Sequence, residues 1–371
     1  MKVAYLAPYY DGTGYGNSAL EVMLAMDSVG IDVVPRSVKM TPKSYPVPDR
    51  VLELEKKDLL NVDFVIQHNL PSTFSYTGKA KNIGWFIYET RGRPMNTWQS
   101  QLGLMDSVFT SCTEDSFTLK TCYDVEKTQT IPFPVNSDKF HKDYGNPLGI
   151  PDKKCVFYTI CEFTKRKDLG SLILSYMNSF DSSDDVLLVI KSGNGNDDLD
   201  AIKKLIENIR SGTRRFPVEY RYPKVLVISS RVSEDQLNSI HQNCHVFVST
   251  SHGESFCLPA LDALGFGNSV LASKCGAFKD YIRPDGINGV LVEGQYIHVF
   301  GAGPQPDNLY SSREKWFRVN TDEFSHNMRT FYDNIHLATH HQACADRTKY
   351  VEENYSYKTV GQLMLDKLAR I

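Results

Sequence analysis

The stretch that decides the fold of this chain covers residues 233–273 and reads SEDQLNSIHQNCHVFVSTSHGESFCLPALDALGFGNSVLAS. Ser233 and the two acidic residues after it predict a helix start, because a serine side chain accepts hydrogen bonds from the first backbone N–H groups of a helix. The apolar run 245–250 predicts a buried strand, and 269–272 predicts a second one. Pro259 between them suits the first turn of a helix. The stretch therefore predicts helix, strand, loop, helix and strand.

Two acidic residues stand near the turn between the strand 245–250 and the helix that follows it. Glu254 lies in the loop 251–256, SHGESF, and Asp262 comes eight residues later. A loop that opens a helix presents backbone N–H groups, which form a ready binding site for a diphosphate. Taken alone, two such acids usually belong to a solvated surface. The complete strand–loop–helix context favours a functional site instead.

Short apolar runs alternate with helical patterns over the rest of the chain. Such near-continuous apolar strands, separated by helices, are typical of parallel sheets that are buried on both faces. The strand candidates form two sets, and two sets predict two doubly wound α/β domains. The first set is 3–8, 32–34, 63–67, 82–87 and 107–111, and the second is 156–160, 186–191, 225–230, 245–250, 269–272 and 289–292. Helices are expected over 17–29 and 357–371.

The domain limits follow from a stretch without periodicity. Residues 134–154 carry three prolines and two glycines and are the best linker candidate. We expect an N-terminal domain over 1–145, a C-terminal domain over 155–345, and a last helix over 350–371 that returns to the N-terminal domain. Residues 295–318 are aromatic and loop-like, and we interpret them as an insertion.

Composition narrows the class of protein. The chain has 371 residues, 41% of them hydrophobic and 23% charged, which is typical of a globular protein. No run approaches the roughly 18 apolar residues of a membrane helix, so we expect no stable membrane insertion and a cytoplasmic location. The eight cysteines form no CxxC pair, which argues against a zinc site. The net charge of −3 does not favour broad capture of nucleic acid.

The segment around Glu254 resembles a known family. ESFCLPALDALGFG, residues 254–267, is similar to the pattern EGFGLPxLEAMAxGxPV of the family 4 retaining glycosyltransferases, and DGINGVLV, residues 285–292, is similar to their DGxNGxLV. The resemblance implies the GT-B fold, in which two Rossmann-like domains face a cleft. It also implies that Glu254 lies against the donor sugar and that Asp262, in place of the usual Glu, holds the ribose. The backbone expected to bind the donor phosphates is that of Ser255, Phe256, Cys257 and Leu258.

The family's second landmark is a basic pair after the first strand of the C-terminal domain. VFYTICEFTKRKDLGSLILSY, residues 156–176, resembles the family's GRLxxxKGxxxLIxA. Lys167 matches the Lys, and a cation there would stabilise the leaving nucleotide diphosphate. The usual Arg position falls on Glu162, which is a departure from the family. The missing charge is left open between Arg166, Lys165 and Arg231. Without the first motif, residues 165–167 are equally well explained as an exposed turn.

The N-terminal half holds a glycine-rich turn, DGTGYGN, at residues 11–17. It follows the first predicted strand and opens a helix, so Gly14 and Gly16 are expected to line the cleft beside the donor phosphates or the acceptor. The turn is weak evidence alone, because tight turns need glycine in any case. Its spacing does not fit the dinucleotide fingerprint, which argues against an NAD enzyme.

Two further residues follow predicted strands of the N-terminal half. Glu89 stands close to the place where relatives have a histidine beside the transferred sugar. It either contacts a sugar or acceptor hydroxyl, or it pairs with Arg91 or Arg93 on the same loop. His68 is either a substrate contact or a packed histidine.

The resemblance thus implies an enzyme that moves a hexose or pentose with retention of configuration. The expected donor is a UDP- or GDP-sugar, the expected acceptor is a hydroxyl group of a glycan, and no cofactor or metal ion is expected. Three alternatives stay open: a glycosyltransferase that acts on a modified DNA base, a nucleotide-sugar 2-epimerase, and a nucleotide-sugar-binding protein without catalysis.

Overall fold

The computed structural model describes residues 1–93, 98–193, 195–216, 221–303, 305 and 308–371. It divides into two compact units. Unit 1 contains Met1–Ser137, Gly303–Glu314 and Glu352–Ile371, and unit 2 contains Asp138–Ala302 and Lys315–Val351. The chain therefore passes between the units four times, after residues 137, 302, 314 and 351. The domain limits expected from the sequence stay predictions.

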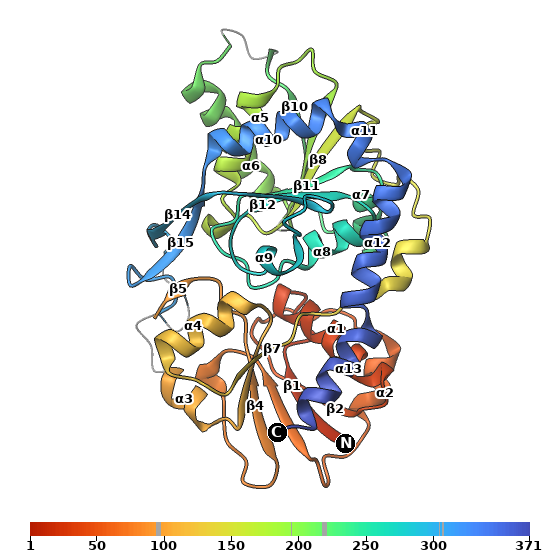
Figure 1. Cartoon of the computed structure of the whole chain (residues 1–371), viewed down its shortest axis with the longest axis vertical. Coiled ribbons are helices and arrows are strands. Elements are labelled where there is room, and N and C mark those ends of the chain that lie inside the picture. The colour runs from red at the N-terminus through yellow and green to blue at the C-terminus, as the bar shows by residue number, and fades with distance from the viewer. Residues whose placement is uncertain (94–97, 194, 217–220, 304, 306–307) are drawn as a thin grey trace. The chain divides into compact units, whose positions relative to one another are not determined.

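Unit 1 is built on a parallel sheet of six strands in the order β2-β1-β3-β4-β6-β7 (Figure 1). The strand order reverses between β1 and β3, and such a switch point is where ligands bind in open parallel sheets. The strands are β1 (Lys2–Ala7), β2 (Asp32–Ser37), β3 (Phe64–His68), β4 (Lys81–Trp85), β6 (Ser107–Thr110) and β7 (Thr128–Thr130), with the short β5 (Arg91–Gly92) outside the sheet.

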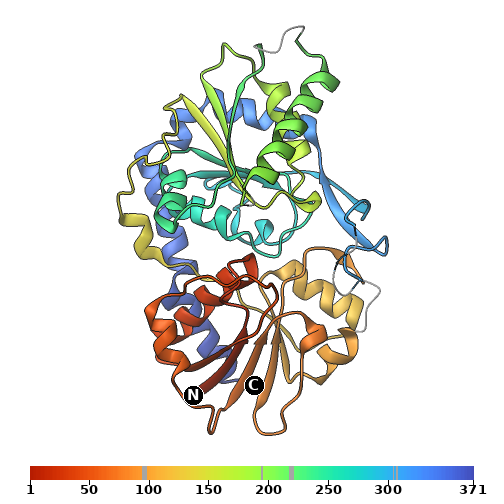
Figure 2. The same ribbon diagram turned by 180° about the vertical axis from the view of Figure 1, so that it is seen from behind.

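Helices flank this sheet, and their starts follow from the sequence (Figures 1 and 2). The Thr13 side chain caps α1 by accepting from Gly16 N, and the Ser356 side chain caps α13 by accepting from Thr359 N. The helices of unit 1 are α1 (Gly14–Ser28), α2 (Asp49–Glu55), α3 (Trp98–Leu104), α4 (Thr113–Tyr123) and α13 (Tyr357–Leu368), with the 3-10 turn η1 (Pro71–Thr73).

Unit 2 repeats this plan with the strand order β10-β9-β8-β11-β12-β13, again all parallel. Counted along the chain this order is 3-2-1-4-5-6, which is the order of the Rossmann fold, with its switch point between β8 and β11. The strands are β8 (Cys155–Ile160), β9 (Val186–Lys191), β10 (Lys224–Ile228), β11 (Val246–Ser249), β12 (Ser269–Ser273) and β13 (Gly289–Val292).

The helices of unit 2 pack around a core of buried aliphatic and aromatic side chains from β8, β9, α5 and α10. Ser233 and Gln236 form a reciprocal capping box at the start of α7, where the sequence predicts a helix. The helices are α5 (Leu169–Ser179), α6 (Asn196–Thr213), α7 (Glu234–Gln242), α8 (Leu258–Gly265), α9 (Phe278–Tyr281), α10 (Thr321–Asp333), α11 (Ile335–Ala338) and α12 (His341–Tyr355), with the 3-10 turns η2 (Ser137–His141) and η3 (Lys165–Lys167).

Each predicted strand is present in the structure, and the ends differ by at most three residues. The largest difference is at β2, which continues through Pro35 to Ser37. A proline is tolerated there because β2 is an edge strand. The predicted strand 82–87 ends earlier, at Trp85, so Glu89 lies in the loop after β4 rather than at the strand end.

The interpretation of 295–318 as loop-like is wrong at both ends. β14 (Gly294–His298) and β15 (Glu314–Val319) pair in antiparallel register, with Tyr296 opposite Phe317. Trp316 and Phe317 are both buried, and because neighbouring side chains of a strand point to opposite faces, β15 is covered on both faces at this point. Residues 304 and 306–307 of this stretch lie outside the described residues.

Helix α13 lies directly on α1 in unit 1, and a glycine makes this close approach possible. A Cβ atom on Gly361 would lie 2.5 Å from the carbonyl oxygen of Ala25 and 2.9 Å from Val29 Cγ1. Neighbouring Val360 and Met364 are buried. The two helix backbones therefore meet at Gly361, where no larger residue fits without moving one of them.

We expect Gly361→Ala to lower the free energy of unfolding by about 1–3 kcal/mol, because an extra methyl group overpacks this contact. Gly103→Ala is the matched control, since no atom lies within 4 Å of a Cβ atom at that position in α3. That change should be neutral or stabilising by up to about 1 kcal/mol. Urea unfolding of the two variants measures the difference, and equal stabilities would contradict this account of the α1–α13 contact.

Candidate active site

The switch point of unit 2 brings two loops together. Strands β8 and β11 are neighbours, with Val246 opposite Phe157, and their carboxyl ends meet at one edge of the sheet. The turn η3 follows β8, and the loop 250–257 follows β11. His252 N donates to Arg166 O at 2.8 Å, and the Thr250 hydroxyl donates to Asp168 O at 2.8 Å. These hydrogen bonds hold the two loops side by side.

Glu254 is the centre of this edge. Its side chain is only 5% exposed, and its Oε1 lies 2.5 Å from Lys167 Nζ. The Ser251 hydroxyl donates to the same oxygen at 2.6 Å, and Arg166 Nη1 lies 3.4 Å from Oε2. The sequence prediction named Lys167, Arg166 and Glu254 separately, and the structure brings these three residues into one cluster.

The charges of this cluster support one another despite their burial. Burial alone would raise the pKa of Glu254, but attraction by Lys167 and Arg166 outweighs it, so the pKa is lowered. Burial likewise opposes the charge on Lys167, and the Glu254 carboxylate offsets it, so the pKa of Lys167 is raised. Two cations face one carboxylate, which leaves the cluster with one net positive charge.

The backbone around Glu254 is fixed by the loop before α9. Ala277 N donates to Glu254 O at 3.1 Å. Gly276 has φ +55°, and a Cβ atom there would lie 1.7 Å from Glu254 O. A side chain at 276 would therefore displace Glu254 itself.

The start of α8 lies next to this cluster in the chain. Ser255 and Phe256 are buried, Leu258 is half-buried, and the Tyr281 hydroxyl donates to Phe256 O at 2.9 Å. Cys257 is the N-cap residue, and its left-handed backbone (φ 67°, ψ 69°) turns the chain into the helix. The N-terminus of a helix carries partial positive charge, so it adds to the positive charge of Lys167 and Arg166.

Asp262 does not join the Glu254 cluster. Its Oδ1 lies 2.7 Å from Nζ of Lys139, which belongs to η2. The two side chains are 14% and 11% exposed, so the contact is largely removed from solvent. Sequence reasoning missed Lys139, because a lysine in a stretch without periodicity gives no signal.

The structure distinguishes the residues considered for the missing family arginine. Glu162, Lys165 and Arg231 are exposed, and Arg231 lies in the loop after β10, toward the far side of the sheet from β11. Only Arg166 among them pairs with Glu254. It also donates to Gly253 O at 2.6 Å.

His252 also belongs to this site, although the sequence gives no prediction for it. Its ring stacks on Trp316 at 5.2 Å, its Nδ1 lies 2.9 Å from Phe317 O, and its Nε2 lies 3.6 Å from Asp168 Oδ2. These contacts hold the loop between Ser251 and Glu254 against both β15 and the start of α5. The buried aromatic partner comes from 64 residues further along the chain, and no sequence pattern links the two.

The switch point of unit 1 lies between β1 and β3. Gly14 is exposed at the start of α1, and Gly16 is buried, with Pro8 O only 3.0 Å from where a Cβ atom would lie. Asp11 Oδ2 accepts from Met40 N at 2.8 Å and from Thr41 N at 2.9 Å, which fixes the loop before α1.

His68 at the end of β3 is a packed histidine. Its ring stacks on Trp85 at 5.1 Å and on Phe133 at 5.6 Å, and its Nδ1 lies 2.6 Å from the Tyr5 hydroxyl. Burial lowers its pKa to about 3, so the imidazole is neutral at physiological pH. The structure thus supports the packed alternative for His68.

Glu89 is half-buried and accepts a hydrogen bond from the Tyr310 hydroxyl. Arg91 Nε lies 2.5 Å from Glu114 Oε1, and Arg93 Nη2 donates to Gln99 at 2.6 Å. Both arginines that sequence reasoning offered as partners of Glu89 thus engage other acceptors.

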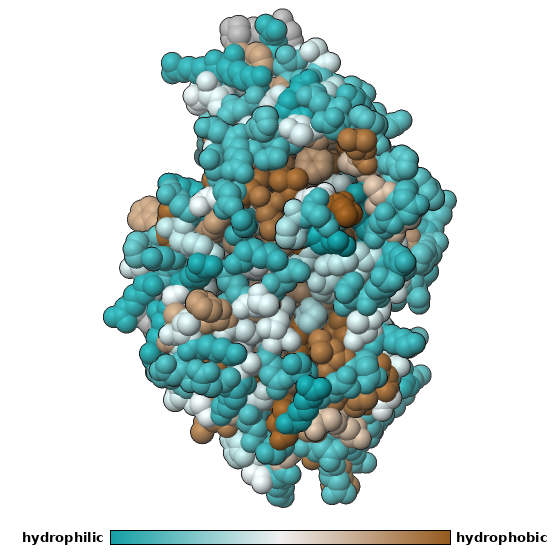
Figure 3. Space-filling view, in the orientation of Figure 1, coloured by the Kyte–Doolittle hydropathy of each residue, from teal (hydrophilic) through white to brown (hydrophobic). Residues whose placement is uncertain are grey.

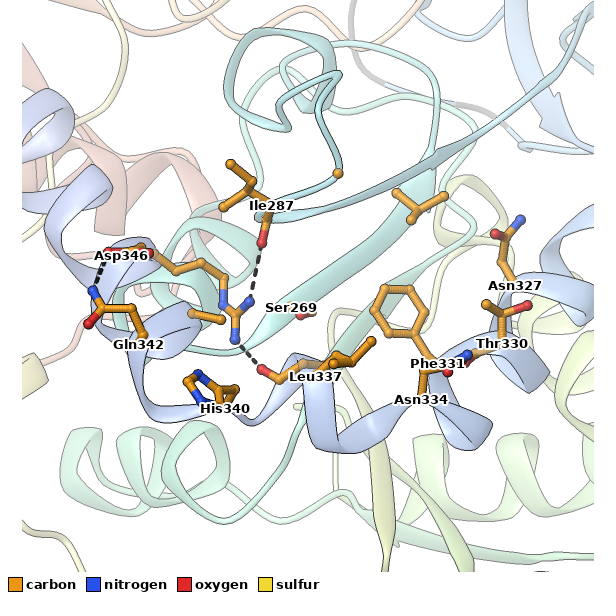
Figure 4. A pocket seen from close by; sticks show the side chains of 15 residues that line it. Ser269, Ile287, Asn327, Thr330, Phe331, Asn334, Leu337, His340, Gln342 and Asp346 are labelled. Carbon is orange, nitrogen blue, oxygen red and sulfur yellow. Dashed lines mark hydrogen bonds between the residues drawn. The ribbon is translucent and has the colours of Figure 1, made fainter.

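Unit 2 has a hollow of about 600 Å³ at the edge of its sheet opposite the Glu254 cluster. It lies near the amino ends of β12 and β13 and is walled by α10, α11 and the start of α12 (Figure 4). Figure 3 shows apolar side chains gathered over this region. The buried Arg347 donates to the carbonyls of Gly267 at 2.8 Å and Ile287 at 3.2 Å, and so ties the loops of this wall together. None of the predicted site residues lines this hollow.

No helix among the described residues is long and apolar enough to cross a membrane. No group of three or more His, Cys, Asp or Glu side chains among them is arranged to hold a metal ion.

Residues 141–302, which include the Glu254 cluster and α8, match the model of a family described as Glycosyl transferases group 1. This part of the chain is thus similar to the group 1 glycosyltransferases. No curated protein matches the chain in a sequence comparison. The matched residues contain Asp262, which pairs with Lys139, and each of the three residues of the Glu254 cluster.

Solved structures share the fold over the whole chain. Sucrose-phosphate synthase from Thermosynechococcus elongatus is 14% identical, with a TM-score of 0.67 over 100% of this chain and 98% of that chain. A glycosyltransferase from Rickettsia africae is 15% identical, with a TM-score of 0.66 over 100% and 98%. HepE from Anabaena, solved with UDP and glucose, is 14% identical, with a TM-score of 0.64 over 100% of both chains. The chain thus has the GT-B fold with two Rossmann-like domains, which confirms the fold that the sequence resemblance implied.

Proposed function

We propose that this protein transfers a sugar from a nucleotide diphosphate sugar to a hydroxyl acceptor with retention of configuration. The observation that carries the proposal is the cluster of Lys167, Arg166 and Glu254 at the switch point of unit 2. A preorganised positive charge, next to the start of a helix, is suited to a leaving diphosphate. HepE from Anabaena, which has the same fold, was solved with UDP and glucose, and we extend the proposal to a UDP-sugar donor.

Each residue of the cluster has a role in this proposal. Lys167 and Arg166 face the diphosphate, together with the backbone of 255–258 at the start of α8. Glu254 holds both cations in place and faces the donor sugar. Asp262 accepts hydrogen bonds from the ribose. Arg231, Gly14 and Gly16 remain candidates for further donor contacts on the loops after β10 and β1.

The proposed reaction needs no separate protein nucleophile. The bond between the anomeric carbon and the diphosphate oxygen breaks, the acceptor oxygen bonds to the same carbon from the same face, and its proton passes to the departing diphosphate. Glu254 is held by two cations and a serine hydroxyl, so its carboxylate is poorly suited to attack. In this proposal the protein's own cations do the electrostatic work, without a metal ion.

We place the acceptor contacts on unit 1 and propose a glycan hydroxyl as the acceptor. One carboxylate oxygen of Glu89 accepts a hydrogen bond from the Tyr310 hydroxyl. We propose that Glu89 also accepts a hydrogen bond from the acceptor hydroxyl or from the transferred sugar. A modified DNA base is a second acceptor class that the assay below distinguishes.

A panel of nucleotide sugars tests the proposal directly. We expect a UDP-sugar to raise the melting temperature, since a ligand at about 100 times its Kd stabilises the folded state by about 2.7 kcal/mol. With glycan and modified-DNA acceptors in turn, NMR of the product should show the anomeric configuration of the donor. An inverted product would refute retention. Epimerisation of the donor without acceptor would point to an epimerase, and binding without turnover to an inactive binding protein.

Removing the Lys167 charge should impair catalysis selectively. We expect Lys167→Ala to reduce kcat by about 10²–10³-fold, the usual effect of losing one preorganised group that stabilises developing charge. Lys165→Ala is the matched control, because Lys165 is exposed in the same turn η3. Its kcat should stay within about twofold of the parent. The circular dichroism spectrum must show that both variants are folded. Equal kcat values for the two variants would remove Lys167 from the reaction.

Substitutions of Glu254 and of Asp262 should affect different steps, namely turnover and nucleotide binding. Asp262→Asn should weaken UDP binding by about 10–100-fold, because a hydrogen bond to a charged acceptor contributes about 1.5–3 kcal/mol. Glu254→Gln, which keeps the shape of the side chain, should mainly lower kcat. Calorimetry with UDP and steady-state kinetics measure the two effects. The assignment is wrong if Asp262→Asn binds UDP as tightly as the parent does.

A further inference from the structure

The contact between Lys139 and Asp262 joins two segments that are far apart in the chain. Lys139 Nζ lies 2.7 Å from Asp262 Oδ1, and this oxygen is buried. The neighbouring Phe140 fixes the segment, since a Cβ atom on Gly265 of α8 would lie 2.1 Å from Phe140 Cζ. Phe140 also packs edge-on against Phe266 at 5.3 Å. Lys139 is therefore held in place by its neighbour and not only by its charge.

The groups around Asp262 make Lys139 its main source of positive charge. His241 of α7 faces the pair, and burial lowers its pKa to about 4, so it is neutral at physiological pH. Its Nδ1 lies 2.8 Å from the hydroxyl of the buried Tyr158. Burial, together with Cys244 and Asp262, raises the pKa of Tyr158, so that hydroxyl is neutral too.

A buried ion pair contributes little net stability, because removing both charges from water costs as much as their attraction returns. The Lys139–Asp262 contact is an ion pair without an aligned hydrogen bond, which makes a purely stabilising role weaker still. Asp262 also stands one methylene shorter than the Glu of the family pattern. A shorter arm reaches less far, so its direction must be set by another group.

We propose that Lys139 is a positioning residue for recognition of the donor ribose. It holds Oδ1 of Asp262, so that Oδ2 is directed to accept a hydrogen bond from a ribose hydroxyl. The proposal rests on the proposed function, because it needs a nucleotide donor. It adds a specificity role for a residue outside the Glu254 cluster: Lys139 makes Asp262 distinguish ribose from a sugar without hydroxyls.

The test compares binding of UDP with binding of 2′,3′-dideoxy-UDP, which lacks both ribose hydroxyls. We expect the parent to bind UDP at least about tenfold more tightly, in line with one hydrogen bond to a charged acceptor. In Lys139→Met the ratio of the Kd for dideoxy-UDP to the Kd for UDP should fall below about threefold, whereas the Kd for dideoxy-UDP should hardly change. Lys139→Arg should restore the ratio. Lys142→Met is the matched control, since Lys142 is exposed on the segment after η2.

A double-mutant cycle shows whether Lys139 acts through Asp262. If it does, the ratio for Lys139→Met combined with Asp262→Asn should equal that of either single variant, because neither residue has a further effect once the other is lost. Should Lys139→Met not fold, Lys139→Gln takes its place in the same comparison. A variant without the Lys139 charge that keeps the parental ratio overturns the inference.

The outcomes also separate this inference from the proposed function. If the parent protein binds neither the ribose form nor the dideoxyribose form of UDP or of GDP, the proposed function is contradicted. If the parent protein binds UDP more tightly than dideoxy-UDP and the Lys139 variants show the same preference, only the role of Lys139 is contradicted.

Discussion

The buried ion pair between Lys167 and Glu254 is the constraint on which the rest of the site depends. An isolated carboxylate at 5% exposure would favour its neutral form. Lys167, Arg166 and Ser251 together keep it charged, and each of them needs its loop in one position. Several contacts hold those loops at the switch point: the hydrogen bonds of His252 and Thr250, the close approach that Gly276 allows because it has no side chain, and the stacking of Trp316 on His252. Much of the packing at this edge of unit 2 therefore serves one pair of charges.

Most of the fold was predictable from the sequence, because buried parallel strands are nearly continuous apolar runs. What the sequence did not reveal are strands with weak patterns. β7 is three polar residues, TQT, and β14 begins at a glycine. β15 is stabilised by burial of Trp316 and Phe317 against distant residues, which a local pattern does not record. Pro35 stopped the prediction of β2 too early, since a proline counts against a strand unless its place at the sheet edge is known.

The candidate site was predictable where the chain follows the family pattern and unpredictable where it departs. Glu254 and Lys167 came from motifs. Arg166 could not be chosen over Lys165 without knowing which side of η3 faces Glu254. Lys139 gave no signal at all. At Cys257 the family pattern has glycine, and the left-handed backbone explains why, since an L-residue there costs about 1–2 kcal/mol.

The four passages of the chain between its units mean that neither unit corresponds to one continuous piece of the gene. A fragment that stops at residue 137 would lack α13, and the surface of α1 that packs around Gly361 would face water. A fragment that starts at residue 138 would carry α13 with no α1 to cover. Neither half is thus a natural module for fusion or exchange between relatives. Recombination within this architecture would have to move the last helix together with the first.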